Sequence, residues 1–440
     1  MRRGSRCSAD LWRQVQGLPH IEAKSAPPGF AHAAALPNGI DGLMFPRVST
    51  NQDTSFDIAV IGGGATGFAA ALTAAAGGFN TIIFAPLVNV SPGRTAALLQ
   101  GSVDVLAELD VWPALSLHAA PLRAIRLVDA TQRLIRAPET TFHASEVGLP
   151  AFGFNLPNGE LVAGLRRRAE AVENIAIIDT PVETVTPGER QALIRTGASN
   201  FTAGLVIAAD GARSLAREAA GIRVRTWNYA QAALVATFTI SQAHGGVSTE
   251  FHTETGPFTL VPLPGDRVSL VWVDRPAEAE RAVGLEAEAL SGEVERRAHS
   301  VHGAMRLDSA PALFPLGAAL ADRFAARRTM LVGEAAHRFP PIGAQGLNLG
   351  FRDVAALRRV LLRHRADPGG SEALDAYHAA RQADIRTRTL AVDLLNRSLL
   401  TDFLPVQAAR GFGLALASSV PILRRALMRQ GLAGSGRRGV

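Results

Sequence analysis

The sequence of 440 residues predicts an α/β plus β protein, in which a Rossmann-like parallel unit is split by an antiparallel sheet and followed by helices. Three observations carry this prediction. Residues 57–84 combine a short apolar run, a helical stretch and a second run rich in β-branched residues, which is the pattern of a βαβ unit. Residues 226–273 alternate with period two between turn signals, as antiparallel strands do. Residues after 347 are helical in composition apart from proline-marked turns.

Each element follows from a local pattern. Short apolar, β-branched runs predict strands, and longer stretches with helical spacing predict helices. In chain order we expect a strand at 57–61, a helix at 65–76, a strand at 81–84, a helix at 94–109, a hairpin at 122–135 turning at 129–131, a helix at 160–171, strands at 175–178, 205–208, 234–240, 258–261 and 268–273, a helix at 285–297 and a strand at 330–332.

The same patterns predict the domain organisation. The parallel unit is discontinuous, because the period-two stretch interrupts it, and helices close the chain. The predicted parts are a disordered extension at 1–54, a parallel-sheet domain at 55–120, 153–222 and 317–365, an antiparallel-sheet domain at 121–152 and 223–316, C-terminal helices at 366–430 and a flexible tail at 431–440. Met44 is an alternative start of translation, which a mass spectrum of the native N-terminus would decide.

The composition excludes several classes of protein. Hydrophobic residues make up 47% and charged residues 19%, which argues against a disordered or fibrous chain. The net charge of +6 comes mostly from scattered arginines without an aromatic-lined basic stripe, so we expect no nucleic-acid partner. Cys7 is the only cysteine, which excludes an intrachain disulfide and favours a reducing, cytoplasmic compartment. We assign no metal to His244 or His252, because neither has ligand-type residues at metal-binding spacing.

The segment 62–67 follows the first strand and opens a helix. Gly62 permits a tight turn, Gly64 lets the backbone approach a pyrophosphate and Gly67 allows close packing, while the helix N-terminus supplies N–H donors. In its βαβ context this segment predicts a dinucleotide site. The second strand runs into Ala85 and lacks the carboxylate that commonly holds the adenosine ribose, so we expect the backbone and other side chains to hold that ribose.

Two further motifs each follow a predicted buried strand. The first is Asp210 with Gly211, and the second is Gly333 with Glu334, which continues through a glycine-rich loop into a helix starting near Gly346. Glu334 can accept a hydrogen bond from a sugar-like hydroxyl, and the first amides of the helix can face an electron-rich ring. Alone, each motif is compatible with a structural turn. Together and in this order they predict a phosphate or flavin site.

With these motifs the sequence resembles class A flavoprotein monooxygenases of the para-hydroxybenzoate hydroxylase fold. The stretches 94–98 with Trp112, 256–263 and 341–353 narrow the resemblance to ubiquinone-biosynthesis hydroxylases, which act on polyprenyl phenols. The resemblance covers about residues 55 to 430. It implies a Rossmann-like FAD-binding domain and an antiparallel substrate domain. It also implies an enzyme that takes a hydride from NADPH or NADH, binds O2 and transfers one oxygen atom to the ring of a prenylated phenol.

The resemblance also implies cofactor-binding roles for the motif residues by their position. Gly62, Gly64 and Gly67 would bind the FAD pyrophosphate, and Arg94 would lie beside the FAD. Asp210 and Gly211 would serve the pyrophosphate and NAD(P)H region, and Gly333 and Glu334 would hold the ribityl chain. Gly346, Leu347 and Asn348 would line the isoalloxazine ring. No catalytic residue is assigned firmly. His337 and Pro341 would lie near the flavin, but a histidine at a helix start is more typical of packing.

The sequence departs from the family pattern at three places. Glu334 stands where the family has aspartate, residues 343–344 read Gly-Ala instead of Ala-Gly, and Ala208 replaces a glycine. Glutamate keeps the charge of aspartate and adds one methylene, so we expect the flavin to be retained with altered geometry. Ala344 requires a negative φ, unless the loop carries strain of about 1–3 kcal/mol.

The C-terminal part contains two apolar helical stretches, 391–399 and the uncharged 411–423. The second is too short to span a bilayer, and it suits either docking at a membrane interface, lining of a prenyl-chain tunnel or an ordinary packed helix hairpin. Six arginines follow Asp402 without an intervening acid, among them Arg424, Arg425, Arg429, Arg437 and Arg438, which suits an anionic membrane surface or a solvated tail. We expect a cytoplasmic protein, with peripheral contact at the inner membrane or membership of a quinone-biosynthesis assembly as further expectations.

Two rival functions remain open at this point. One is a monooxygenase of the same fold that acts on a soluble aromatic compound, for which the C-terminal helices would be dispensable. The other is a non-catalytic scaffold subunit of a quinone-biosynthesis assembly. The missing ribose carboxylate and Glu334 motivate the scaffold alternative, and a well-folded preparation without bound FAD would favour it.

Overall fold

The computed structural model of the protein describes residues 54–87, 93–132, 136–197, 199–340 and 345–400, together with Arg424, Arg425 and Met428. The predicted extension before Thr54, the segment 411–423 and the tail 431–440 lie outside the described residues. The described residues all belong to one unit of the chain.

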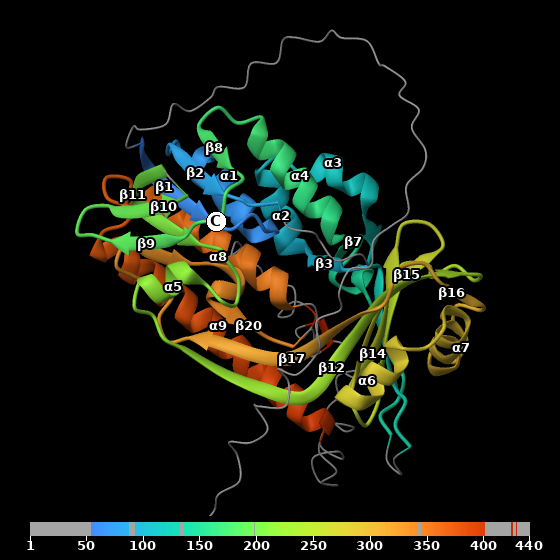
Figure 1. Ribbon diagram of the computed structural model, residues 1–440. Helices are drawn as coiled ribbons and strands as arrows, with labels where there is room; N and C mark the ends of the chain where they lie inside the picture. Colours follow the sequence, from blue (N-terminus) through green and yellow to red (C-terminus); the bar gives the residue numbers. More distant parts are fainter. Residues whose placement is uncertain are drawn as a thin grey trace, which may run out of the picture. The chain divides into compact units, whose positions relative to one another are not determined.

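The predicted parallel unit is an eight-stranded sheet (Figure 1). It is formed by β1 (Thr54–Ile61), β2 (Thr81–Phe84), β8 (Ile175–Ile178), β9 (Thr184–Pro187), β10 (Ala192–Thr196), β11 (Ser199–Ala208), β18 (Ala325–Ala326) and β19 (Thr329–Leu331). The strands β19, β11, β1, β2 and β8 are parallel neighbours in that order. Strands β9, β10 and β18 are added to it by antiparallel pairing. The strands predicted at 81–84 and 175–178 are confirmed with the same bounds.

Helices cover this sheet and complete its core. They include α1 (Ala65–Ala76), α4 (Asn158–Glu170), α5 (Leu215–Ala219), α8 (Gln345–Arg363) and α9 (Ser371–Leu400). α1 contacts both α4 and α8, and α8 contacts α9. The predicted helix at 65–76 is confirmed with the same bounds, and its small alanine side chains let the neighbouring elements approach closely. Ile58, Phe68, Leu205 and Leu357 lie in the resulting core and are fully buried.

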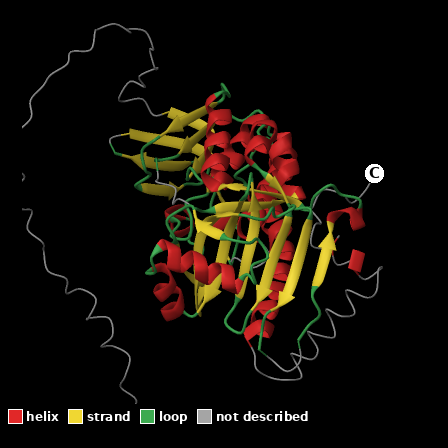
Figure 2. Cartoon of the chain, turned by 90° about the vertical axis from the view of Figure 1, so that its right-hand side faces the viewer, coloured by secondary structure: helices red, strands yellow, loops and turns green. Residues whose placement is uncertain are grey.

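The predicted antiparallel sheet has nine strands. Figure 2 shows long strands of the protein lying side by side. They are β5 (Ala124–Asp129), β6 (Thr140–His143), β12 (Val224–Ile240), β13 (Val247–His252), β14 (Pro257–Leu263), β15 (Arg267–Asp274), β16 (Met305–Leu307), β17 (Ala312–Ala321) and β20 (His337–Arg338). The order along the sheet is β20, β17, β12, β15, β14, β13, β5 and β6, with β16 paired to β12. Only β13 and β5 pair in parallel. One face carries a second core with α6 (Pro276–Val283) and α7 (Ala287–Arg297).

A small third sheet and a short helix lie between these parts, and they correct one prediction. Residues 94–109 are not a single helix, because β3 (Thr95–Leu99) precedes α2 (Gln100–Glu108). β3 alternates between buried and half-buried residues and pairs with β7 (Gly153–Pro157), which also pairs with β4 (Ala120–Pro121). The helix α3 (Trp112–Leu115) follows α2. Pairing with residues more than 50 positions away overrides the helical composition of this stretch.

Other predictions place strand ends wrongly, and β11 begins at Ser199, six residues before the predicted 205–208. The hairpin that begins at β5 returns along β6, beyond the predicted end at residue 135, and the side chain of Asp129 accepts hydrogen bonds from Thr131 and Ala137. β12 begins ten residues before the predicted 234–240, because it pairs with β17 along its N-terminal half. Figure 1 shows β12 and β17 running side by side toward the eight-stranded sheet.

The few described residues near the C-terminus contact the edge of the nine-stranded sheet. Arg424 donates hydrogen bonds from Nε and Nη2 to the carboxylate of Glu146, at 2.5 Å and 2.7 Å, and lies 4.6 Å from the ring centroid of Phe142. Met428 packs in a small cluster with Phe152. In the described part of the chain, no helix has both the length and the apolar character needed to cross a membrane.

We expect the ion pair between Arg424 and Glu146 to make the stability depend on pH. The hydrogen bonds from Arg424 lower the pKa of Glu146 to about 2, from an ordinary value of 4.5. The stabilising effect of the ionised Glu146 is therefore present above pH 4.5 and is lost as the pH falls from 4.5 toward 2. Thermal unfolding should show that Glu146→Gln lowers Tm at about neutral pH, and that the difference from the wild type shrinks in acid. The more exposed Glu139, which pairs with Arg126, serves as the control as Glu139→Gln; an equal and pH-independent Tm difference for both variants would contradict this expectation.

Candidate functional site

Three loops meet at one edge of the eight-stranded sheet. The N–H of Gly62 donates to the carbonyl of Phe84, that of Ala209 to Ile61 and that of Val332 to Ala208, each at 2.8–2.9 Å. These bonds continue the parallel ladders beyond the strand ends, so the three predicted motifs leave β1, β11 and β19 side by side. Ligands of open α/β sheets bind in this position, at the carboxyl ends of the strands. This edge is therefore the candidate cofactor site.

The glycines of the first loop divide into two kinds. Gly62 has a φ of +116°, and a Cβ on Gly67 would lie 1.9 Å from the carbonyl oxygen of Gly62. Protein backbone therefore fills the space beside both of these residues. A Cβ on Gly64 would meet nothing within 4 Å, and Gly64 is the N-cap of α1 with no side-chain hydrogen bond. Open space at unpaired helix N–H groups fits the close approach of a pyrophosphate.

Asp210 follows β11, and only one of its two carboxylate oxygens accepts a hydrogen bond from the described residues. Its Oδ2 accepts a hydrogen bond from the N–H of Ala216 at 3.1 Å. Its Oδ1 is buried and accepts none from any described residue. Gly211 beside it has a φ of +79° and open space around its Cβ position. A buried carboxylate oxygen without a protein donor fits the hydroxyl of a ligand, because leaving it unpaired is unfavourable.

The third loop is held in place by the buried carboxylate of Asp353. Gly333 has a φ of +61°, and its N–H donates to Oδ2 of Asp353 at 2.8 Å. A Cβ on Gly333 would lie 3.3 Å from Oγ1 of Thr66, which joins this loop to the start of α1. Glu334 is exposed and belongs to the short helix η3 (Gly333–Ala335). The fixed glycine thus presents the Glu334 carboxylate at the open edge of the sheet.

His337 belongs to this buried support. Its Nε2 bonds to Oδ2 of Asp353 at 2.8 Å, and Arg381 of α9 donates to Oδ1 at 2.6 Å. Burial alone would raise the pKa of Asp353, but His337 and Arg381 outweigh it and hold that pKa below its ordinary value. His337 is only 2% exposed, and its Nδ1 has no hydrogen-bond partner among the described residues. This placement fits the packing role that the sequence favoured for His337.

The start of α8 is tied to the segment before α2. Asn348 accepts hydrogen bonds from Leu99 and Ser102 and donates one to the carbonyl of Ala97 at 2.8 Å. Its side chain therefore fixes the helix to the small sheet. Gly346 is exposed with open space at its Cβ position, and Leu347 is half-buried against the main core. Pro341 and residues 342–344 lie outside the described part of the chain.

Two arginines connect the parts around this edge. Arg94 is exposed, and its guanidinium lies 5.1 Å from the ring centroid of Phe314, so it spans from β3 to the nine-stranded sheet. The sequence motifs gave no role to Arg217, which is buried and donates to the carbonyls of Ala335 and Ala212 at 3.1 Å and 3.0 Å. It therefore links the second and third loops. Its position three residues after Ser214 was the available sequence signal.

The end of β2 confirms the absence of a ribose carboxylate at that position. Ala85 is 1% exposed, and a Cβ on Gly63 would lie 2.7 Å from its methyl group. The described residues also contain no group of three or more His, Cys, Asp or Glu side chains placed to bind a metal ion.

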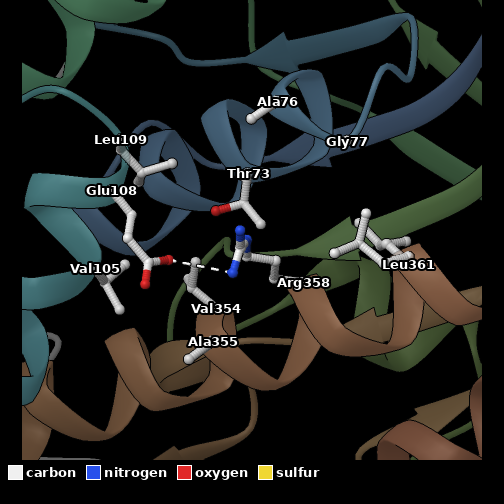
Figure 3. A pocket seen from close by; sticks show the side chains of 11 residues that line it. Thr73, Ala76, Gly77, Val105, Glu108, Leu109, Val354, Ala355, Arg358 and Leu361 are labelled. Carbon is white, nitrogen blue, oxygen red and sulfur yellow. Dashed lines mark ion pairs between the residues drawn. The ribbon is translucent and has the colours of Figure 1, made fainter. Parts of the chain in front are cut away.

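A separate small pocket of about 100 Å³ lies at the other end of α1 (Figure 3). It is lined by Thr73, Gly77, Val105 and other residues of α1, α2 and α8, and Arg358 lies 3.4 Å from Glu108 across it. The open position at Gly64 is about 13 Å away along the helix, given a rise of about 1.5 Å per residue. The pocket is thus distinct from the candidate cofactor site.

Comparison with known proteins places this arrangement in the class of FAD-dependent monooxygenases. The family model described as FAD binding domain matches residues 55–389. The chain therefore belongs to this FAD-binding-domain family. The p-nitrophenol 4-monooxygenase PnpA from Pseudomonas putida has a similar fold, with a TM-score of 0.73, 18% identity, and coverage of 88% of this chain and 100% of that chain.

Two similar relatives carry ubiquinone-related names. The ubiquinone hydroxylase UbiL of Rhodospirillum rubrum is 30% identical over 396 residues, covering 88% of this chain and 91% of the relative. The 3-demethoxyubiquinol 3-hydroxylase of Escherichia coli is 31% identical over 396 residues, covering 87% of this chain and 99% of the relative. The resemblance derived from the sequence motifs is thereby confirmed at the level of the family.

Proposed function

We propose that this protein hydroxylates the aromatic ring of a polyprenyl phenol in ubiquinone biosynthesis, using FAD, O2 and NADPH or NADH. The observation that carries the proposal is the meeting of three loops at one sheet edge, where an open helix N-terminus and an unpartnered carboxylate oxygen lie together. The names of the ubiquinone-related relatives support the substrate class.

The residues at the edge fit FAD. Gly62, Gly64 and Gly67 would bind its pyrophosphate at the start of α1, where the helix dipole favours negative charge. Asp210 and Glu334 would accept hydrogen bonds from hydroxyl groups of the cofactor. Reduced FAD supplies the activation of O2 that ring hydroxylation requires.

Other residues would surround the ring system and the phenol. Gly346, Leu347 and the backbone of Asn348 would line the isoalloxazine ring, while the Asn348 side chain positions them through its bonds to 97–102. Arg94 would lie beside the cofactor. The nine-stranded sheet would carry the substrate, in keeping with the predicted division into cofactor and substrate domains.

The proposed function also bears on where in the cell the enzyme works. We expect a cytoplasmic protein that contacts the inner membrane peripherally or joins a quinone-biosynthesis assembly, since a prenyl chain partitions into lipid. The C-terminal arginines support such contact with an anionic surface. The proposal includes no nucleic-acid partner.

Deleting the gene in its host and measuring prenylated phenols and quinones by mass spectrometry tests this function. An intermediate that lacks one ring oxygen should accumulate and disappear on complementation. The purified protein should contain FAD and consume NADPH or NADH with a prenylated phenol. A quinone pool unchanged by the deletion, together with folded protein that lacks FAD, would favour the scaffold alternative. FAD-loaded protein that hydroxylates only soluble phenols would favour the soluble-aromatic alternative.

A further inference from the structure

We propose that His252 and Glu250 form an acid–base pair that removes the proton from the ring hydroxyl of the phenol substrate. This inference rests on the proposed function and names residues to which the sequence motifs gave no role. Both residues are on β13, two positions apart, so their side chains point to the same face of the sheet. Nε2 of His252 lies 2.8 Å from Oε1 of Glu250. His252 is 8% exposed, and Glu250 is half-buried.

The pair lies on the face of the nine-stranded sheet that is opposite to α6 and α7. Phe251 and Phe258, which alternate with it, point to the opposite face and are buried against α6 and α7. Glu250 lies opposite Thr259 of β14, and Thr259 lies opposite Val271 of β15. Val271 in turn lies opposite Val235 of β12, so these four residues form one row across the sheet. All members of this row are half-buried, whereas the core residues of the opposite face are nearly all fully buried. A row of short, largely apolar side chains left partly uncovered fits the flat face of an aromatic ring.

Strands β3 and β7 of the small third sheet cover the neighbouring row. Ser269 lies two residues before Val271 on β15 and therefore on the same face. Its Oγ accepts hydrogen bonds from Thr95 of β3 at 3.0 Å and from Asn155 of β7 at 3.2 Å. β3 begins directly after Arg94, one of the predicted FAD residues. The small sheet that follows Arg94 therefore covers the row next to that of Glu250, on the same face as the acid–base pair.

The hydrogen bond fixes which nitrogen of His252 can accept a proton. A carboxylate only accepts hydrogen bonds, so Nε2 must carry the hydrogen that points to Glu250. In the neutral ring Nδ1 is then the acceptor, and no described residue bonds to it. Oε2 of Glu250 lies 3.5 Å from Oγ1 of Thr259, which also limits rotation of the carboxylate.

The proposed step is a simple proton transfer. The O–H bond of the phenol breaks, a bond from the proton to Nδ1 of His252 forms, and the electron pair stays on the ring oxygen. Glu250 stabilises the imidazolium that results. The phenolate has a more electron-rich ring than the phenol, and transfer of oxygen to a ring carbon requires such a ring. The proton returns to the product oxygen or to solvent, so no oxidant or reductant is needed for this step.

Binding of a coloured phenol tests the pair without turnover. The full-length, FAD-loaded protein is titrated with 2-prenyl-4-nitrophenol, whose phenolate absorbs visible light, over a range of pH. We expect the wild type to raise the ionisation constant of the bound probe about tenfold over that of the free probe, and His252→Gln and Glu250→Gln to abolish this increase. Glu254→Gln, an exposed carboxylate in the following turn, is the control and should behave as the wild type. An equal increase in wild type and both variants would overturn the proposal.

Turnover separates this proposal from the proposed function. With a prenylated phenol, both variants should lose hydroxylation about 10²-fold while retaining FAD and the oxidation of NAD(P)H without substrate. A fluorinated phenol that is already ionised at the assay pH should restore much of the rate. A wild type that forms no hydroxylated product would overturn the proposed function. A wild type that hydroxylates, with both variants within twofold of it, would overturn only the role of His252 and Glu250.

Discussion

Gly67→Ala is expected to prevent stable folding of the first loop, and Gly64→Ala is expected to leave the fold intact but remove FAD. The new methyl group at Gly67 would lie 1.9 Å from the backbone oxygen of Gly62 and 3.2 Å from the methyl of Ala209. Neither neighbour is a flexible side chain that can move aside. Overpacking of this kind costs about 1–3 kcal/mol and occasionally more. Urea unfolding of the cofactor-free protein measures this loss.

Gly64→Ala separates folding from cofactor binding. Its Cβ would meet no protein atom within 4 Å, and the φ of −77° suits alanine. The free energy of unfolding without FAD should therefore change by less than about 1 kcal/mol. The methyl group would stand where the pyrophosphate approaches, so the amount of FAD released from purified protein should fall at least tenfold. Gly159→Ala in α4, which also has open space at its Cβ position, is the control. Full FAD content in Gly64→Ala would contradict the assignment of this loop.

Asp353→Asn is expected to destabilise the protein by about 3 kcal/mol, the lower end of the range for a broken buried ion pair, because Arg381 keeps Asp384, 2.8 Å away, as a second charge partner. Arg381 is 1% exposed and donates to Asp353 at 2.6 Å. The same carboxylate holds the N–H of Gly333 at 2.8 Å, so the variant should also release FAD more readily. Denaturant unfolding and flavin release measure the two effects separately.

An exposed ion pair on α9, the helix that carries Arg381, provides the matched control. Asp375 of α9 lies 3.0 Å from Arg323, with side-chain exposures of 71% and 52%. Solvated pairs contribute about 0–1 kcal/mol, so Asp375→Asn should change the stability little and leave the FAD content unchanged. Equal losses of stability for Asp353→Asn and Asp375→Asn would show that the buried network is not the support of the third loop.

The local parts of the fold could be predicted from the sequence because their signals are local. The bounds of the helix at 65–76 and the strands at 81–84 and 175–178 match the structure. Glycines punctuate the first βαβ unit, and its strands are continuous apolar runs because both faces of the sheet are buried. Residues 94–99 were assigned wrongly, since their strand state depends on pairing with 153–157, which no local pattern reveals.

The functional residues divide in the same way. The sequence by itself determined the FAD-binding family and the residue types of the three loops, because turns at strand ends need glycine and carboxylate at fixed spacing. Only the tertiary structure decided that these loops are neighbours, because strand order is set by pairing between distant segments. It also decided that Asn348 positions the small sheet, and that His252 has a half-buried carboxylate partner on the face of the nine-stranded sheet opposite to α6 and α7. Burial and the face of a strand to which a side chain points are properties of the packed chain. The spacing of Glu250 and His252 in the sequence therefore could not by itself predict that the two side chains pair.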